Sequence, residues 1–172
     1  MRFRFPHASS RRLLAGLLAA ALLGACGGDS DGGTTAAALK VPIAAADGSS
    51  ATLADLGGTP LVVNLWATWC SPCVKEMPAL DEVASEVSGV RIIGVNVGDD
   101  PAAAASFAAD LGVSYPQYTD VDGGLMSEFA IANLPATAFI DADGTVLDVH
   151  SGAYTADELR AAIADHFPDL GG

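Results

Sequence analysis

The sequence contains few cysteines and few histidines. Of its 172 residues, three are Cys, at positions 26, 70 and 73, and three are His. A framework of structural disulfides would need more cysteines, and a four-ligand zinc site would need more Cys or His close together. We therefore predict neither a disulfide scaffold nor a metal site.

Basic residues are also scarce. Eight Lys and Arg stand against 21 Asp and Glu, and four of the eight are Arg2, Arg4, Arg11 and Arg12. Beyond residue 25, four basic residues face all 21 acidic ones, which gives this part of the chain a net charge of −17. An acidic body of this kind repels nucleic acid and anionic lipid headgroups, so we predict no nucleic-acid partner.

The chain has no apolar run that is long enough to span a bilayer. The run at residues 13–25 has 13 residues, whereas a transmembrane helix needs ~20. A basic start, a short apolar run and small residues before a cleavage point are typical of a secretory signal peptide, which we assign to residues 1–25. Leu23-Gly24-Ala25-Cys26 resembles the lipobox of bacterial lipoproteins, in which lipid is attached to the sulfur of the cysteine.

The residues after Cys26 fit this interpretation, since the Gly-rich polar stretch at 26–37 predicts a flexible tether. An ordinary signal peptide followed by an incidental cysteine is the alternative. Arg11-Arg12 also resembles a twin-arginine export signal, which leaves the choice between this route and Sec open. On either route, we expect the domain to work on the extracytoplasmic face of a bacterial cell membrane, where disulfides persist.

Two cysteines lie at a predicted strand-to-helix junction. The run Leu61 to Trp66, apolar except for Asn64, predicts a buried central strand. A helical pattern begins at Trp69-Cys70-Ser71-Pro72-Cys73 and runs to about Val87. The free N–H groups at a helix start stabilise a thiolate at Cys70. Because the thiolate is the nucleophile in disulfide exchange, this dithiol predicts redox chemistry.

The rest of the chain predicts one α/β domain over residues 38–170. A strand at Leu39–Ile43, a turn and a return element over residues 51–56 form an N-terminal β-extension, and Tyr115–Thr119 is predicted as a short edge or connecting segment. The remaining predicted strands are 90–97, 136–140 and 145–149, and the remaining predicted helices are 101–111, 124–129 and 155–167.

The run from Asn64 to Cys73, Asn-Leu-Trp-Ala-Thr-Trp-Cys-Ser-Pro-Cys, carries a family resemblance. From about Leu39 to Phe167 the chain resembles the thioredoxin fold, a central mixed β-sheet flanked by helices. It looks most like the TlpA/ResA branch of membrane-tethered extracytoplasmic thiol-disulfide oxidoreductases. The resemblance implies that Cys70 attacks, that Cys73 resolves the mixed disulfide, and that this redox-active pair works without another cofactor.

The same resemblance points to a substrate surface around the cysteines. Leu134-Pro135 matches the position of the family's cis-proline loop, whose backbone pairs with an extended substrate segment. A proline that simply starts a strand is the alternative. Trp69 borders Cys70, and both substrate contact and core packing fit it, whereas core packing is the expectation for Trp66.

Proton handling is assigned to Glu76 in this branch. It follows Cys73 by one helical turn, where a carboxyl group with a raised pKa could relay a proton. Asn64 occupies the position of the family's buried aspartate and cannot titrate, which gives Glu76 more weight. A solvated helix glutamate near Lys75 is the alternative.

Together these features predict a lipid-anchored protein-disulfide reductase. Its expected partners are protein clients, such as apocytochrome c during cytochrome c maturation, and a membrane thiol that donates electrons to it. We expect the protein itself to be a monomer. The direction of electron flow stays open. A copper-delivery module and a peroxidase-type relative share the fold, but the former spaces its cysteines one residue wider, and the latter has Thr where this chain has Ala67.

Overall fold

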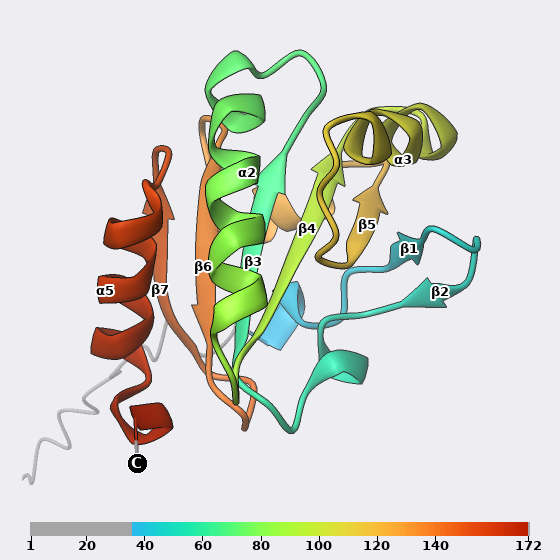
Figure 1. The fold of residues 1–172 in the computed structure, drawn as a ribbon. Helices are drawn as coiled ribbons and strands as arrows, with labels where there is room; N and C mark the ends of the chain where they lie inside the picture. The colour runs from blue at the N-terminus through green and yellow to red at the C-terminus, as the bar shows by residue number, and fades with distance from the viewer. Residues whose placement is uncertain (1–35, 172) are drawn as a thin grey trace, which may run out of the picture.

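The computed structural model describes residues 36–171, which form an α/β domain around one mixed sheet of seven strands (Figure 1). The strand order is β2-β1-β5-β4-β3-β6-β7. Strands β3, β4 and β5 run parallel, and the other neighbours are antiparallel. The strands are β1 (Ile43–Ala45), β2 (Ser50–Ala51), β3 (Leu61–Trp66), β4 (Arg91–Val97), β5 (Gln117–Asp120), β6 (Ala136–Ile140) and β7 (Val146–Ser151).

Helices cover both faces of this sheet. In Figure 1, α2, α3 and α5 lie over the face toward the viewer, and α4 lies behind the sheet. No helix among residues 36–171 is long and apolar enough to cross a membrane. The bounds are α2 (Ser71–Glu86), α3 (Pro101–Asp110), α4 (Gly124–Glu128) and α5 (Ala156–His166), with 3-10 turns η1 (Ala54–Leu56) and η2 (Pro168–Gly171).

Strand β3 lies at the centre of the sheet and all six of its residues are buried. Because side chains alternate along a strand, Val63 and Leu65 join the apolar cluster on the α4 side, while Val62 and Trp66 pack under α2 and its neighbours. Burial on both faces explains why every residue of this strand except Asn64 is apolar.

The predicted helix starts are confirmed. The Asp100 side chain accepts hydrogen bonds from the backbone N–H groups of Ala102 and Ala103 at the start of α3. Thr155 and Glu158 form a capping box at the predicted start of α5, with reciprocal side-chain to backbone bonds. These local signals place α3 and α5 close to their predicted bounds.

Two strand predictions were wrong. The strand predicted at Leu39–Ile43 begins only at Ile43, because the N–H groups of Lys40 and Val41 bond to carbonyls three residues earlier in a helical turn. Tyr115–Thr119, predicted as a short edge or connecting segment, overlaps β5, an interior strand that pairs with β4 on one side and β1 on the other. The N-terminal β-extension therefore completes the sheet beyond β5.

The predicted leader lies outside the described residues. This holds for the signal peptide at 1–25, for Cys26 and for most of the tether at 26–37. The last two residues of the predicted tether, 36 and 37, are helical, and Ala38, the first residue of the predicted domain, is fully buried.

Candidate active site

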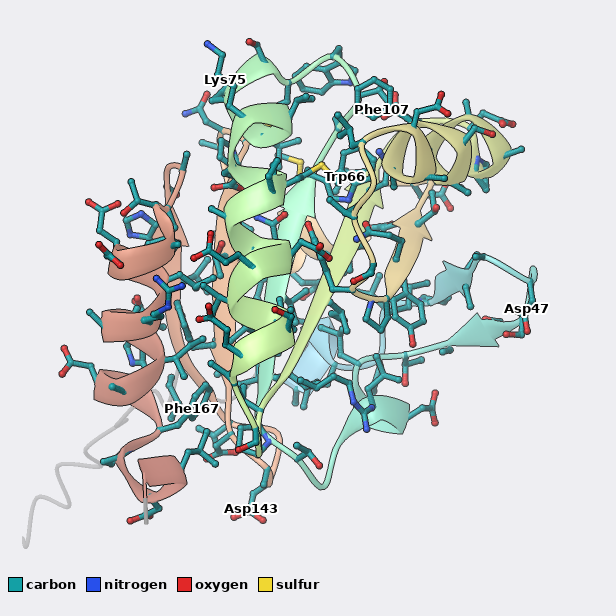
Figure 2. All side chains as sticks on the ribbon, viewed as in Figure 1. Asp47, Trp66, Lys75, Phe107, Asp143 and Phe167 are labelled. Atoms are coloured by element: carbon teal, nitrogen blue, oxygen red, sulfur yellow. A yellow bond between two sulfur atoms is a disulfide. The ribbon has the colours of Figure 1, made fainter. Side chains whose placement is uncertain are left out.

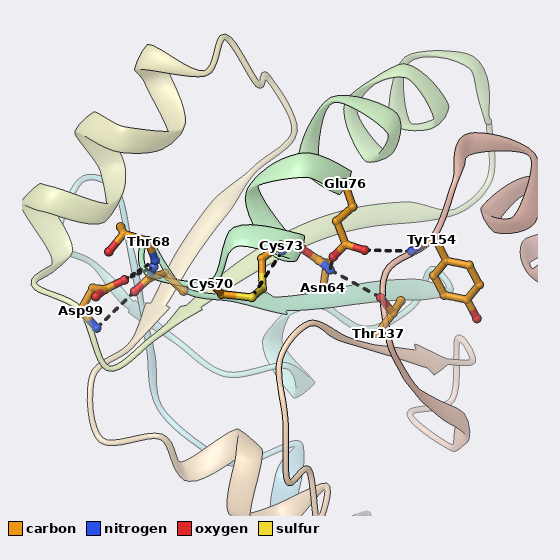
Figure 3. Close-up of a disulfide and its surroundings, with 9 residues drawn as sticks. Asn64, Thr68, Cys70, Cys73, Glu76, Asp99, Thr137 and Tyr154 are labelled. Carbon is orange, nitrogen blue, oxygen red and sulfur yellow. Dashed lines mark hydrogen bonds between the residues drawn. A yellow bond between two sulfur atoms is a disulfide. The ribbon is translucent and has the colours of Figure 1, made fainter.

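The two cysteines lie at the junction between β3 and α2, and they are joined by a disulfide with a Cα–Cα distance of 5.3 Å (Figure 3). Cys70 is the N-cap of α2, and its Sγ accepts the backbone N–H of Cys73 at 3.3 Å. Cys70 keeps 5% of its surface exposed, whereas Cys73 keeps none. A helix-start N–H directed at Sγ is the arrangement that stabilises a thiolate when the disulfide is opened.

Glu76 is buried one turn further into α2, with 3% of its surface exposed. Its Oε1 accepts the Asn64 Nδ2 at 2.6 Å, and its Oε2 accepts the backbone N–H of Tyr154 at 2.9 Å (Figure 3). Burial raises the pKa of Glu76 to about 7, although both hydrogen bonds act in the opposite direction. The alternative of a solvated glutamate is therefore excluded.

The bond between Leu134 and Pro135 is cis, as predicted. Strand β6 follows directly and pairs with β3, with Ala136 opposite Leu65, so the loop lies next to the strand that leads into the cysteines. Leu134 packs against the apolar cluster that contains Cys70 and Cys73. The loop is held from its other side, because the Gly152 N–H donates to the Pro135 carbonyl at 2.9 Å.

The two tryptophans have opposite environments. Trp66 is fully buried near the disulfide, where its ring stacks on Phe107 with centroids 6.1 Å apart (Figure 2). Its Nε1 donates to the Gln117 side chain at 3.0 Å, which confirms core packing for this residue. Trp69, adjacent to Cys70, is 71% exposed, so core packing is excluded there.

Comparison with known proteins places this geometry in a family. The model of the family described as Redoxin matches residues 32–163. The chain belongs to the Redoxin family. Within it, the similarities below support the TlpA/ResA-like thioredoxin-fold branch and make the chain a thiol-disulfide oxidoreductase.

Two curated relatives are similar over the domain. The thiol-disulfide oxidoreductase ResA of Geobacillus thermodenitrificans is 31% identical over 116 residues, which are 66% of this chain and 67% of that protein. The thiol:disulfide interchange protein DsbE of Pseudomonas fluorescens biotype C is 39% identical over 120 residues, 69% of this chain and 66% of that protein. The chain therefore matches about two thirds of the length of these relatives.

Solved structures agree with this placement. MTB DsbF superposes with a TM-score of 0.69 at 32% identity, covering 76% of this chain and 97% of DsbF. A secreted Mycobacterium tuberculosis disulfide oxidoreductase, described as homologous to Escherichia coli DsbE, gives a TM-score of 0.66 at 28% identity, covering 74% and 96%.

Asp99 is a residue of this Redoxin-family site that the sequence did not predict. Asp99, after β4, accepts the backbone N–H of Thr68 and the Asn96 Nδ2, each at 2.8 Å (Figure 3). Although partial burial acts to raise it, these hydrogen bonds lower the pKa of Asp99. Asp99 thus ties the β4–α3 loop to the turn that carries Cys70. The available signal was an acidic residue at the carboxyl end of a strand parallel to β3.

The raised pKa of Glu76 predicts a specific pH dependence of stability. Between the unfolded value of 4.5 and the native value of about 7, the native state keeps a proton that the unfolded state has lost. The free energy of unfolding therefore falls as pH rises through this window, by about 3 kcal/mol, and levels off above it. Urea unfolding of the oxidised protein from pH 4 to 8 measures this contribution as the difference from Glu76→Gln.

Glu82→Gln, on an exposed part of the same helix, is the matched control for this measurement. We expect the Glu76→Gln curve to diverge from that of the native sequence as pH rises, and the Glu82→Gln curve to follow it. Parallel curves for all three proteins would show that Glu76 titrates in its ordinary range.

Proposed function

We propose that this oxidoreductase is lipid-anchored outside the cytoplasm and reduces disulfides in exported proteins. The observation that carries the proposal is the position of Cys70. It caps α2 and is bonded to Cys73, which lies one helical turn before the buried Glu76. The pair itself is the redox group, and the reaction assigned to it needs no further cofactor.

In this mechanism Cys70 is the nucleophile. Its thiolate attacks a client disulfide, which forms a Cys70–client mixed disulfide and releases one client thiolate. The Cys73 thiol then loses its proton, and its thiolate attacks the Cys70 sulfur. The second client thiolate leaves, and the Cys70–Cys73 disulfide holds the oxidising equivalents. A membrane thiol donor would return two electrons to the pair.

Glu76 is the proposed acceptor of the Cys73 proton. The two residues are on adjacent turns of α2, and both are shielded from solvent. With a pKa of about 7, the carboxyl group exchanges protons readily near neutral pH. The proton passes from Cys73 to Glu76 as the thiolate forms, so the charge balance of the buried site is kept.

The proposed client-binding surface comprises Trp69, Leu134 and Pro135. The exposed Trp69 ring offers an apolar contact beside Cys70. The cis-proline loop lies next to the strand that leads into the cysteines, which suits strand addition by an extended client segment. An unfolded apocytochrome c offers an extended segment with paired haem-attachment cysteines, and we propose it as a client. We propose that the enzyme binds it as a monomer.

In this mechanism the two cysteines act at different steps, so their substitutions should have different effects. In insulin reduction with dithiothreitol, Cys70→Ala is expected to lower turnover to the rate of dithiothreitol alone, because no nucleophile remains. Cys73→Ala is expected to accumulate mixed disulfides, detected as adducts on non-reducing gels. Ser71→Ala, at the exposed position between them, is the control. Turnover by Cys70→Ala at the native rate would contradict the mechanism.

The anchor is tested separately in a bacterial host. Cys26→Ala is expected to move the protein from the membrane fraction to the soluble extracytoplasmic fraction, because a lipid attached to this sulfur is the proposed membrane contact. Labelling with a radioactive fatty acid should mark the native sequence and not the variant. Equal membrane retention of both proteins, with no label in either, would contradict lipidation.

A further inference from the structure

Asn64 contacts the buried carboxyl group from the sheet. It is fully buried on β3, and its Nδ2 lies 2.6 Å from Glu76 Oε1 and 3.5 Å from the Thr137 hydroxyl (Figure 3). Its Oδ1 is buried and accepts no hydrogen bond from any described residue. The amide therefore directs a donor at Glu76 and leaves its acceptor unused.

We propose that Asn64 is a positioning residue for Glu76. Its amide donates through Nδ2 to the Glu76 carboxylate, and rotates to accept through Oδ1 from the Glu76 carboxylic acid. This inference rests on the proposed function, in which Glu76 takes up and releases the Cys73 proton. It gives an active part to the residue at the position of the family's buried aspartate: Asn64 carries no proton, but it can hydrogen-bond to either form of the group that does.

The backbone determines which carboxyl oxygen changes. Oε2 accepts the Tyr154 N–H, which needs an acceptor in both protonation states. The proton is therefore placed on Oε1, the oxygen that faces Asn64. An O–H at Oε1 and an N–H at Nδ2 are both donors, and rotation of the amide by half a turn brings the Oδ1 acceptor to the proton instead.

The neighbouring Thr137 accommodates both orientations of the amide. A hydroxyl group is donor and acceptor at once, so it can accept from Nδ2 or donate to Oδ1 without moving its oxygen. Thr137 is fully buried on β6 and stands opposite Asn64 in the β3–β6 register. Each orientation leaves one amide group without a partner, which keeps the two orientations comparable in free energy.

The other ionisable groups near Glu76 do not compete for its proton. Tyr115 and Tyr154 both have raised pKa values, first through burial and then through nearby acidic groups that include Glu76, so both stay neutral near pH 7. Lys75, the adjacent cation on α2, is exposed. Cys73 is thus the group that exchanges a proton with Glu76 in the reduced protein.

The test follows the resolving step in the full-length protein. A Cys70–glutathione mixed disulfide is formed, and the release of glutathione by Cys73 is measured from pH 5 to 9. We expect Asn64→Leu, which keeps the branched shape of the side chain but removes the amide, to shift the midpoint up by about one pH unit. Release at pH 6 should then slow about tenfold, because less Glu76 is ionised. Thr119→Val, which replaces a buried polar residue on β5 with an apolar one, is the matched control.

A spectroscopic readout on the native sequence shows the rotation itself. In ¹⁵N-labelled reduced protein, nuclear Overhauser contacts from the Asn64 Nδ2 protons to the Glu76 side chain are expected at high pH. They should be lost at low pH with the midpoint of the Glu76 carboxyl carbon. In Glu76→Gln, whose amide can donate at every pH, the contacts should no longer depend on pH.

Contacts that stay unchanged while Glu76 titrates would overturn the proposal, even if Asn64→Leu fails to fold. An Asn64→Leu profile equal to that of the native sequence would overturn it as well. A profile that is the same for the native sequence and Glu76→Gln would instead remove Glu76 as proton acceptor, which is a failure of the proposed function. The two failures are therefore distinguishable.

Discussion

The hydrogen bond from the Cys73 N–H to the Cys70 sulfur is the interaction on which the site depends. It exists because β3 ends at the centre of the sheet and α2 begins immediately, with Cys70 as its cap. A helix start leaves backbone donors free, and here one of them is aimed at a sulfur atom. The neighbouring strand β6 brings the Pro135 loop to the same place. The strand-to-helix junction thus supplies the reactive group, and the loop before β6 lies beside it as the proposed binding surface.

The burial of Glu76 beside the same junction changes its ionisation and carries a cost in free energy. Burial disfavours the ionised carboxylate, and the structure offsets only part of this with donors from Asn64 and Tyr154. A pKa near neutrality is the result. In the proposed mechanism, a site that holds a proton briefly while Cys73 becomes a thiolate needs such an intermediate affinity. The burial of one carboxyl group would then lower stability above neutral pH and permit this proton transfer.

Much of the fold could be predicted because its signals are local. The apolar run of β3, the cap and proline at Asp100 and the capping box at Thr155 all lie within a few residues of the elements they define. The burial of Glu76 and the cis bond at Pro135 came from the family resemblance. The interior place of β5 could not be read from its short, polar sequence, because strand order depends on distant partners. Backbone donors, such as the Tyr154 N–H, leave no mark in a sequence at all.

The measurement that tests the central claim most directly is the alkylation of the reduced protein by iodoacetamide at pH 7, with each cysteine quantified by mass spectrometry over time. The account predicts that Cys70 is modified first and that Cys73 stays largely unmodified, since Cys70 receives the helix-start N–H and retains some exposure. Preferential modification of Cys73, or equal rates for both cysteines, would contradict the assignment of Cys70 as the nucleophile.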